Sequence, residues 1–190
     1  MQDLKDKHFE LPAAELVELV ADAHERTLQC VADLDDAQLT VPLLDIVNPF
    51  VWELGHVAFF YDVFLLRLLE GSDPVMAGGD DLYNSFKVDH DDRWSLPLPS
   101  RAETLGYMRR VMELVVERLN SRQPSAVEAY LYLLAVLHED MHDEAFTYMR
   151  QTLGYPEPAF ADAGTGATPD APGGGSLPGD VDVPAAEFQL

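Results

Sequence analysis

Four long segments in the first 155 residues carry apolar side chains at helical spacing, and this periodicity limits the fold more than any other feature. The first runs from about residue 13 to 34 and the second from 48 to 71. The third opens at Ser100, and the fourth runs from about 124 to 153. Helices of this length hide their apolar faces by packing together, so the pattern predicts an all-α, four-helix bundle.

Residues that start and stop helices stand at the ends of these segments. Asn48 is suited to cap the second helix and Pro49 to be its first residue, while Gly71 is a stop signal. Ser100 and Glu103 have the spacing of a capping box, in which each side chain bonds the other residue's backbone amide. These signals support the helical interpretation.

The composition changes after residue 155. Residues 156–190 contain 6 of the 12 glycines and 6 of the 13 prolines, with six acidic residues and no basic one. Such a composition is typical of a connector. We therefore predict a helical domain at 1–155, a flexible Gly/Pro-rich linker at 156–180 and, at 181–190, the strand-like start of a truncated second domain.

The charge of the chain narrows its possible partners. Twelve basic against 34 acidic residues give a net charge of −22, which disfavours nucleic acid and anionic membranes as partners. A hydrophobic fraction of 47% is too high for a disordered acidic chain. The single Cys30, the charged N-terminal residues and the absence of a long apolar run predict a cytoplasmic protein without a membrane span.

His138 and His142 stand four residues apart, one turn of the fourth helix, within reach of a single metal ion. The spacing alone is equally consistent with two solvated histidines. Both, however, lie within the apolar stripe of the segment, where an unpartnered imidazole would cost about 1–3 kcal/mol. The stripe includes Leu131, Leu134, Ala135, Ala145, Phe146 and Met149.

His56 lies among apolar residues of the second helix, beside Trp52, and Gly55 would let a neighbouring helix approach closely. Alone, His56 would more often be a core histidine bonded to a carbonyl group. Together with His138 and His142, it is more simply explained by a shared three-histidine metal site. Three neutral ligands leave a divalent ion with open positions for a thiolate and a small molecule such as dioxygen. We further expect the carboxylate of Glu53, Glu139 or Asp143 to orient one of the ligand imidazoles. Of these three residues, Glu53 directly follows Trp52 in the sequence.

Three motifs occur in order: NPFVWELGH at 48–56, YNS at 83–85 and HEDMHDE at 138–144. They resemble the N-terminal DinB-like domain of ergothioneine-type sulfoxide synthases (EgtB-like), including the selenoneine-synthase branch. The resemblance covers most of residues 10–155. The segment VPAAEF at 183–188 looks like the opening of the formylglycine-generating-enzyme-like domain that follows in that family.

The resemblance implies a non-haem Fe(II) bound by His56, His138 and His142. In that family, dioxygen drives carbon–sulfur or carbon–selenium bond formation between a small thiol or selenol donor and a trimethylated histidine. It also implies that arginines of the long loop at 71–99 hold donor carboxylates, with Arg93 and Arg101 as candidates. The second domain, in cis or in trans, would complete the pocket. Met141 stands where ergothioneine synthases commonly have a glutamine that faces the substrate.

Two other interpretations remain open from the sequence. One is a single-domain DinB-like transferase or isomerase that depends on a thiol and uses the same histidines with Zn or Ni. The other is a non-catalytic helical interaction module whose histidines are core residues. Metal content separates the three: iron indicates the first, zinc or nickel the second, and no stoichiometric metal the third.

Overall fold

The computed structural model describes residues 11–161, and within them the regular structure is entirely helical, as predicted. The chain divides into two compact units, Met1–Phe160 and Ala161–Leu190. The predicted linker from 162 onwards and the predicted start of a second domain lie outside the described residues. The long helices are α1 (Ala13–Gln29), α3 (Phe50–Tyr61), α6 (Arg101–Ser121) and α7 (Ala126–Leu153).

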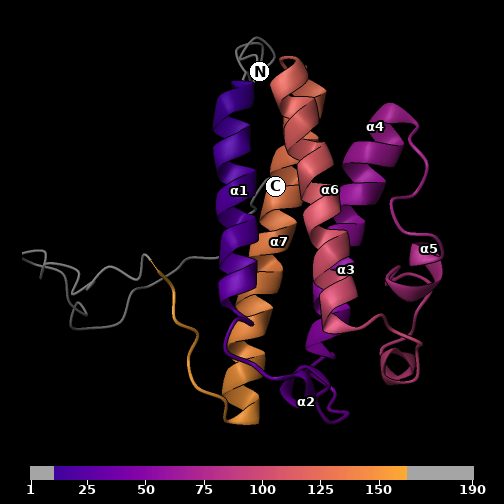
Figure 1. Cartoon of the computed structure of the whole chain (residues 1–190), viewed down its shortest axis with the longest axis vertical. Helices are drawn as coiled ribbons and strands as arrows, with labels where there is room; N and C mark the ends of the chain where they lie inside the picture. Colours follow the sequence, from indigo (N-terminus) through magenta and orange to yellow (C-terminus); the bar gives the residue numbers. More distant parts are fainter. Residues whose placement is uncertain (1–10, 162–190) are drawn as a thin grey trace, which may run out of the picture. The chain divides into compact units, whose positions relative to one another are not determined.

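Helices α1, α3, α6 and α7 form a four-helix bundle in which α1 and α3 each pack against both α6 and α7 (Figure 1). Helix α3 is prolonged by a π-helical turn, η1 (Asp62–Arg67), and by α4 (Leu68–Glu70). Short elements lie between the long helices: α2 (Asp36–Leu39), α5 (Gly79–Leu82) and the 3-10 helix η2 (Asp91–Trp94). No helix within residues 11–161 is long and apolar enough to cross a membrane.

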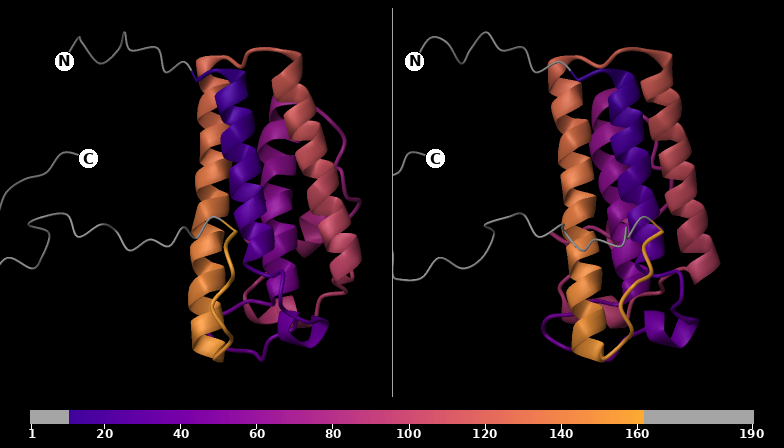
Figure 2. Two further views of the ribbon diagram at one scale, coloured as in Figure 1. Left: turned by 60° about the vertical axis from the view of Figure 1, so that its left-hand side comes forward. Right: turned by 90° about the vertical axis from the view of Figure 1, so that its left-hand side faces the viewer.

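The directions of the helices explain the long loop. Helices α3 and α6 run the same way, as do α1 and α7, whereas α3 and α7 run in opposite directions (Figures 1 and 2). A chain that leaves the end of α4 must therefore return along the bundle before it can begin α6. Residues 71–100 make this return, and α5 and η2 lie within it. The loop thus places α5 beside α3.

Most of the predicted helix ends are confirmed. Ser100 caps α6 through a capping box with Glu103, and Gly71 and Gly154 end their helices in the left-handed conformation that glycine adopts without strain. The prediction for Asn48 is wrong. Pro49 is the N-cap of α3, and the Asn48 side chain instead bonds side chains of the site.

The first helix is shorter than its apolar stripe suggests. Helix α1 ends at Gln29, although Val31 and Leu34 are buried as the stripe predicts. The chain turns here because Asp35 starts a new helix, α2, with a capping box of its own, and because arginines bond the carbonyl oxygens of the turn. Apolar periodicity therefore continues past the last helical residue.

Arg150 of α7 joins the ends of α1 and α7, and its side chain is fully buried. Its guanidinium donates two 2.8 Å bonds to the Asp33 carboxylate and one of 2.8 Å to the carbonyl oxygen of Cys30. A further bond of 2.7 Å reaches the carbonyl oxygen of Pro156. Charged hydrogen bonds of this bidentate kind are among the strongest in proteins.

We predict that Arg150→Ala lowers the free energy of unfolding by about 2–4 kcal/mol, because it leaves buried carbonyl groups without donors and opens a cavity. Urea denaturation measures this effect. Asp33→Asn is the matched control: Asp33 is about half exposed, so its loss costs less. Equal effects of the two substitutions would contradict the assignment of the larger part to the carbonyl bonds.

Candidate metal centre

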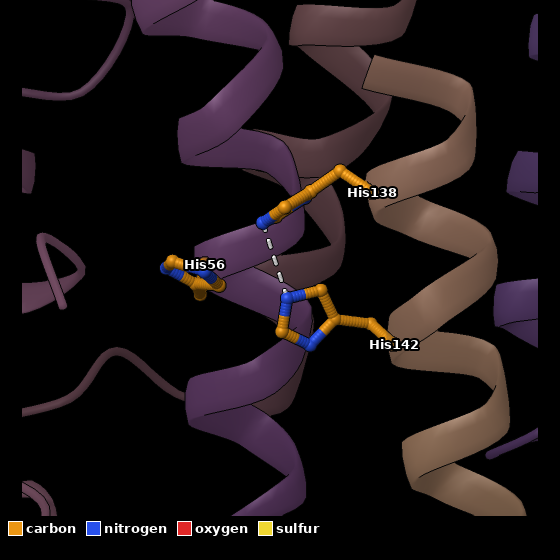
Figure 3. Close-up of side chains that lie close together, drawn as sticks. All are labelled: His56, His138 and His142. Carbon is orange, nitrogen blue, oxygen red and sulfur yellow. Dashed lines mark hydrogen bonds between the residues drawn. The ribbon is translucent and has the colours of Figure 1, made fainter. Parts of the chain in front are cut away.

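Three histidines from two antiparallel helices meet in the bundle: His56 from α3, and His138 and His142 from α7 (Figure 3). One ring nitrogen of each lies within 4.8 Å of the other two. The Nε2 atoms of His138 and His142 are 3.3 Å apart. The structure therefore brings together the three residues that the sequence predicts as ligands.

The far nitrogens of two rings are held by groups of α3 and of the loop. Nδ1 of His56 lies 2.7 Å from the carbonyl oxygen of Tyr83, so it must carry the hydrogen, and Nε2 keeps its lone pair. Nδ1 of His142 lies 2.6 Å from Oε2 of Glu53, a close contact that is not a well-formed hydrogen bond. Oε1 of Glu53 in turn accepts a bond from the Asn48 amide.

Aromatic rings enclose the cluster. Trp52 stacks on His56 with ring centroids 4.8 Å apart, and Phe60 stacks on His138 at 3.7 Å. His56 and His142 are buried, and His138 is partly buried. These rings fix the imidazole planes and reduce the access of water to them.

Burial keeps two of the rings neutral. It lowers the pKa of His56 to about 4, with a further contribution from the neighbouring His142. It lowers the pKa of His138 to about 2, with His142 and His56 adding to the effect. Burial alone would raise the pKa of Glu53, but its contacts with His142 outweigh it, and the pKa is lowered. Neutral imidazoles beside a carboxylate are the charge state in which histidines bind metals.

This donor set fits a divalent metal ion. Two Nε2 atoms that face each other at 3.3 Å repel unless a proton or a cation lies between them. With metal–nitrogen bonds of about 2.1 Å, the same separation corresponds to an angle of about 100° at the metal. Three ligands from one side leave positions open for other molecules, the arrangement of catalytic rather than structural sites.

The three acidic candidates have different surroundings. Glu53 is the one whose carboxylate lies against a histidine of the cluster. Glu139 accepts a 2.7 Å bond from the Tyr61 hydroxyl, and the Thr27 hydroxyl, which has one hydrogen to donate, lies 2.9 Å from Glu139 and 2.7 Å from Asp143. Glu139 and Asp143 thus face α1 and the end of α3, where they fix the rotation of α7 about its axis.

The two candidate arginines line one pocket of about 280 Å³ near the start of α3. Arg93 lies 3.9 Å above the Trp52 ring and donates a 2.7 Å bond to Oδ1 of Asn48. Arg101 bonds the carbonyl oxygens of Leu34 and Val31, so its guanidinium is already engaged by backbone. The Trp52 ring contacts both Arg93 of this pocket and His56 of the cluster.

Sequence reasoning missed two parts of the site. It assigned Asn48 to a helix cap, whereas the side chain joins Arg93 to Glu53. It also gave no role to the backbone of Tyr83, because a carbonyl group leaves no trace in residue identity. Gly55 was expected to admit a neighbouring helix; instead, the ring of Tyr83 from the loop lies against it. The YNS motif at 83–85 was the one feature of the sequence that could have pointed to Tyr83.

Known proteins match the chain over the same region. The profile of the DinB superfamily matches residues 19–148. A hercynine oxygenase of Mycolicibacterium thermoresistibile is 34% identical over 167 residues, which are 84% of this chain and 35% of that protein. Hercynine oxygenases of Mycobacterium tuberculosis and Mycolicibacterium smegmatis are 32% and 30% identical, over 66% and 92% of this chain.

The chain spans about a third of the length of these relatives, between 29% and 40% of each. The similarity therefore concerns one part of a longer protein. The matched region contains all three histidines and Glu53.

We predict that His142→Ala abolishes stoichiometric binding of Fe²⁺ while the helical content stays near that of the parent chain. The two remaining ligand nitrogens, from His56 and His138, cannot replace the third. Anaerobic Fe²⁺ titration and far-UV circular dichroism measure the two properties. His24→Ala is the control on α1. Undiminished uptake by the His142 variant would contradict the site.

A second substitution tests the carboxylate. We expect Glu53→Gln to weaken Fe²⁺ binding about 10–100-fold, because the amide no longer carries the negative charge beside His142. Competition with a chelator gives the affinity. Glu139→Gln, on the other face of α7, should leave Fe²⁺ affinity closer to that of the parent chain, and an equal loss in both would mean that Glu53 has no special role.

Proposed function

The chain belongs to the DinB superfamily, and we propose that its three-histidine cluster is the Fe(II) centre of an oxygen-dependent enzyme. The enzyme would act on hercynine, the Nα-trimethylated histidine, and join its ring to a small thiol or selenol donor. Such an enzyme would act in ergothioneine or selenoneine biosynthesis. The names of the three relatives support the substrate class.

One observation carries the proposal: three imidazoles converge, with Nδ1 of His56 bonded to the Tyr83 carbonyl and Nδ1 of His142 against the Glu53 carboxylate. An all-nitrogen, neutral triad leaves the full charge of a divalent ion available to an anionic thiolate. When bound, iron supplies the redox chemistry that couples dioxygen to carbon–sulfur or carbon–selenium bond formation. A helical module without catalytic function has no use for this convergence of unprotonated nitrogens.

The residues around the triad hold it ready for that chemistry. Glu53 places negative charge at Nδ1 of His142, which keeps the hydrogen on that nitrogen and the lone pair on Nε2. Trp52 and Phe60 cover His56 and His138 and exclude water from their planes. Arg93, held by Asn48, offers a cationic group to a donor carboxylate in the adjoining pocket, and Arg101 lines the same pocket.

The relatives are longer than this chain, so completion of the substrate site is part of the proposal. Hercynine and the donor would be enclosed between this bundle and a further, formylglycine-generating-enzyme-like domain, present in cis or in trans. The bundle alone would bind iron and the donor thiol. The additional domain would then contribute the remaining contacts to the acceptor.

The proposal predicts that the chain binds one equivalent of Fe²⁺ and that its nitric oxide adduct gives an electron paramagnetic resonance signal that a thiol changes. Cysteine and γ-glutamylcysteine are the probes, and Arg93→Ala should weaken the response to the thiol about tenfold or more. His138→Ala should give no adduct.

The outcomes separate the competing interpretations. Tight binding of zinc or nickel with no affinity for Fe²⁺ would favour a thiol-dependent transferase or isomerase. Failure to bind any of these metals would leave a non-catalytic module. An iron adduct that ignores both thiols would contradict the proposed donor class.

A further inference from the structure

We propose that residues 79–83, which comprise α5 and Tyr83, are a positioning element for His56, held in place by Trp52 and admitted by Gly55. The proposal rests on the metal site described above and concerns how one ligand is prepared for it. Nothing in the motifs themselves assigns this role to α5, Trp52 or Gly55. The contacts of α3 with this segment assign it.

Two side chains of α3 bond two consecutive carbonyl groups of the segment. Nε1 of Trp52 donates a 2.8 Å bond to the carbonyl oxygen of Leu82, and Nδ1 of His56 donates one of 2.7 Å to that of Tyr83. Trp52 and His56 are one helical turn apart, and their rings are nearly parallel, at 9°. The segment therefore contacts α3 at two points, one of which is a metal-ligand candidate.

Gly55 makes this approach possible. A Cβ atom at position 55 would lie 2.1 Å from Cε1 and 2.2 Å from Cζ of Tyr83, distances that side chains never adopt. Glycine inside a helix costs about 1 kcal/mol relative to alanine, so α3 carries a cost at this position. Because position 55 carries no side chain, the ring of Tyr83 fits against the helix. This ring is fully buried and stacks on Tyr107.

The Tyr83 carbonyl determines which nitrogen of His56 can bind a metal. A carbonyl oxygen only accepts, so its partner Nδ1 must carry the hydrogen. Nε2 is then left with its lone pair facing His138 and His142. Without this bond the hydrogen could reside on Nε2, where it would block the position that a metal ion needs. The segment thus acts on the metal through His56, without touching the ion.

A double-mutant design tests the assignment. Gly55→Ala should weaken anaerobic Fe²⁺ binding about 10–100-fold, the usual cost of losing a group that orients a ligand. Gly106→Ala on α6 is the matched control, because it also places a methyl group on a helical glycine but would come no nearer than 3.9 Å to a neighbouring atom. It should bind Fe²⁺ like the parent chain. Tyr83→Leu lacks Cε1, Cζ and the hydroxyl, so Gly55→Ala should have little effect in that background.

A second readout is independent of metal. In the metal-free chain labelled with ¹⁵N-histidine, the parent His56 should show the tautomer with hydrogen on Nδ1. Gly55→Ala should shift His56 towards the other tautomer while the signals of His24 stay in place. Trp52→Phe, which removes the bond to Leu82, should shift His56 in the same direction. A variant that merely loosened the fold would move all histidine signals together.

Each result decides between explanations. Equal Fe²⁺ loss from Gly55→Ala in the parent chain and in the Tyr83→Leu variant, or an unchanged His56 tautomer in both Gly55→Ala and Trp52→Phe, would overturn the positioning role. If Gly55→Ala does not fold, Trp52→Phe supplies the same test. Failure of the parent chain to bind Fe²⁺ would instead contradict the proposed function, whereas the tautomer measurement would still judge the positioning element.

Discussion

The repulsion between three imidazole nitrogens that face one another is the constraint to which the rest of this bundle responds. Nε2 of His138 and Nε2 of His142 are 3.3 Å apart, and His56 approaches both. Lone pairs at such distances are stable together only around a cation or a shared proton. The protein has to hold the rings in this position before the cation arrives. Trp52 and Phe60 stack on His56 and His138, the Tyr83 carbonyl accepts a bond from Nδ1 of His56, and the Glu53 carboxylate lies against Nδ1 of His142.

These groups come from different parts of the chain. Glu53 is three residues before His56 on α3, and because α3 and α7 are antiparallel, it lies opposite His142. The long loop supplies the Tyr83 carbonyl for His56. On the far side of α7, Glu139 and Asp143 bind Thr27 of α1, which turns the histidine face of α7 towards α3.

Residue type and spacing were sufficient to predict the four helices and the triad. The apolar period gave the helix faces, and the position of His138 and His142 within a face placed them inside the bundle. The partners could not be obtained in that way. A backbone carbonyl such as that of Tyr83 is common to all residues, so its role follows only from the path of the loop. Asn48 is as suitable for a helix cap as for a bond to another side chain. Only the position of Glu53 in the structure shows that the Asn48 side chain bonds Glu53. Helical periodicity could not show where α1 ends, since Val31 and Leu34 remain buried beyond it.

The junction between α3 and the π-helical turn that follows it also bears on the position of His56. Tyr61 and Asp62 are both buried, yet the hydroxyl of Tyr61 bonds Glu139 of α7, while the carboxylate of Asp62 accepts a bond from Tyr107 of α6. Two adjacent residues thereby attach the end of α3 to both of its neighbours. Because His56 is less than two turns before this point, the attachment limits rotation of α3 about its axis, and the aim of the His56 ring depends on that rotation.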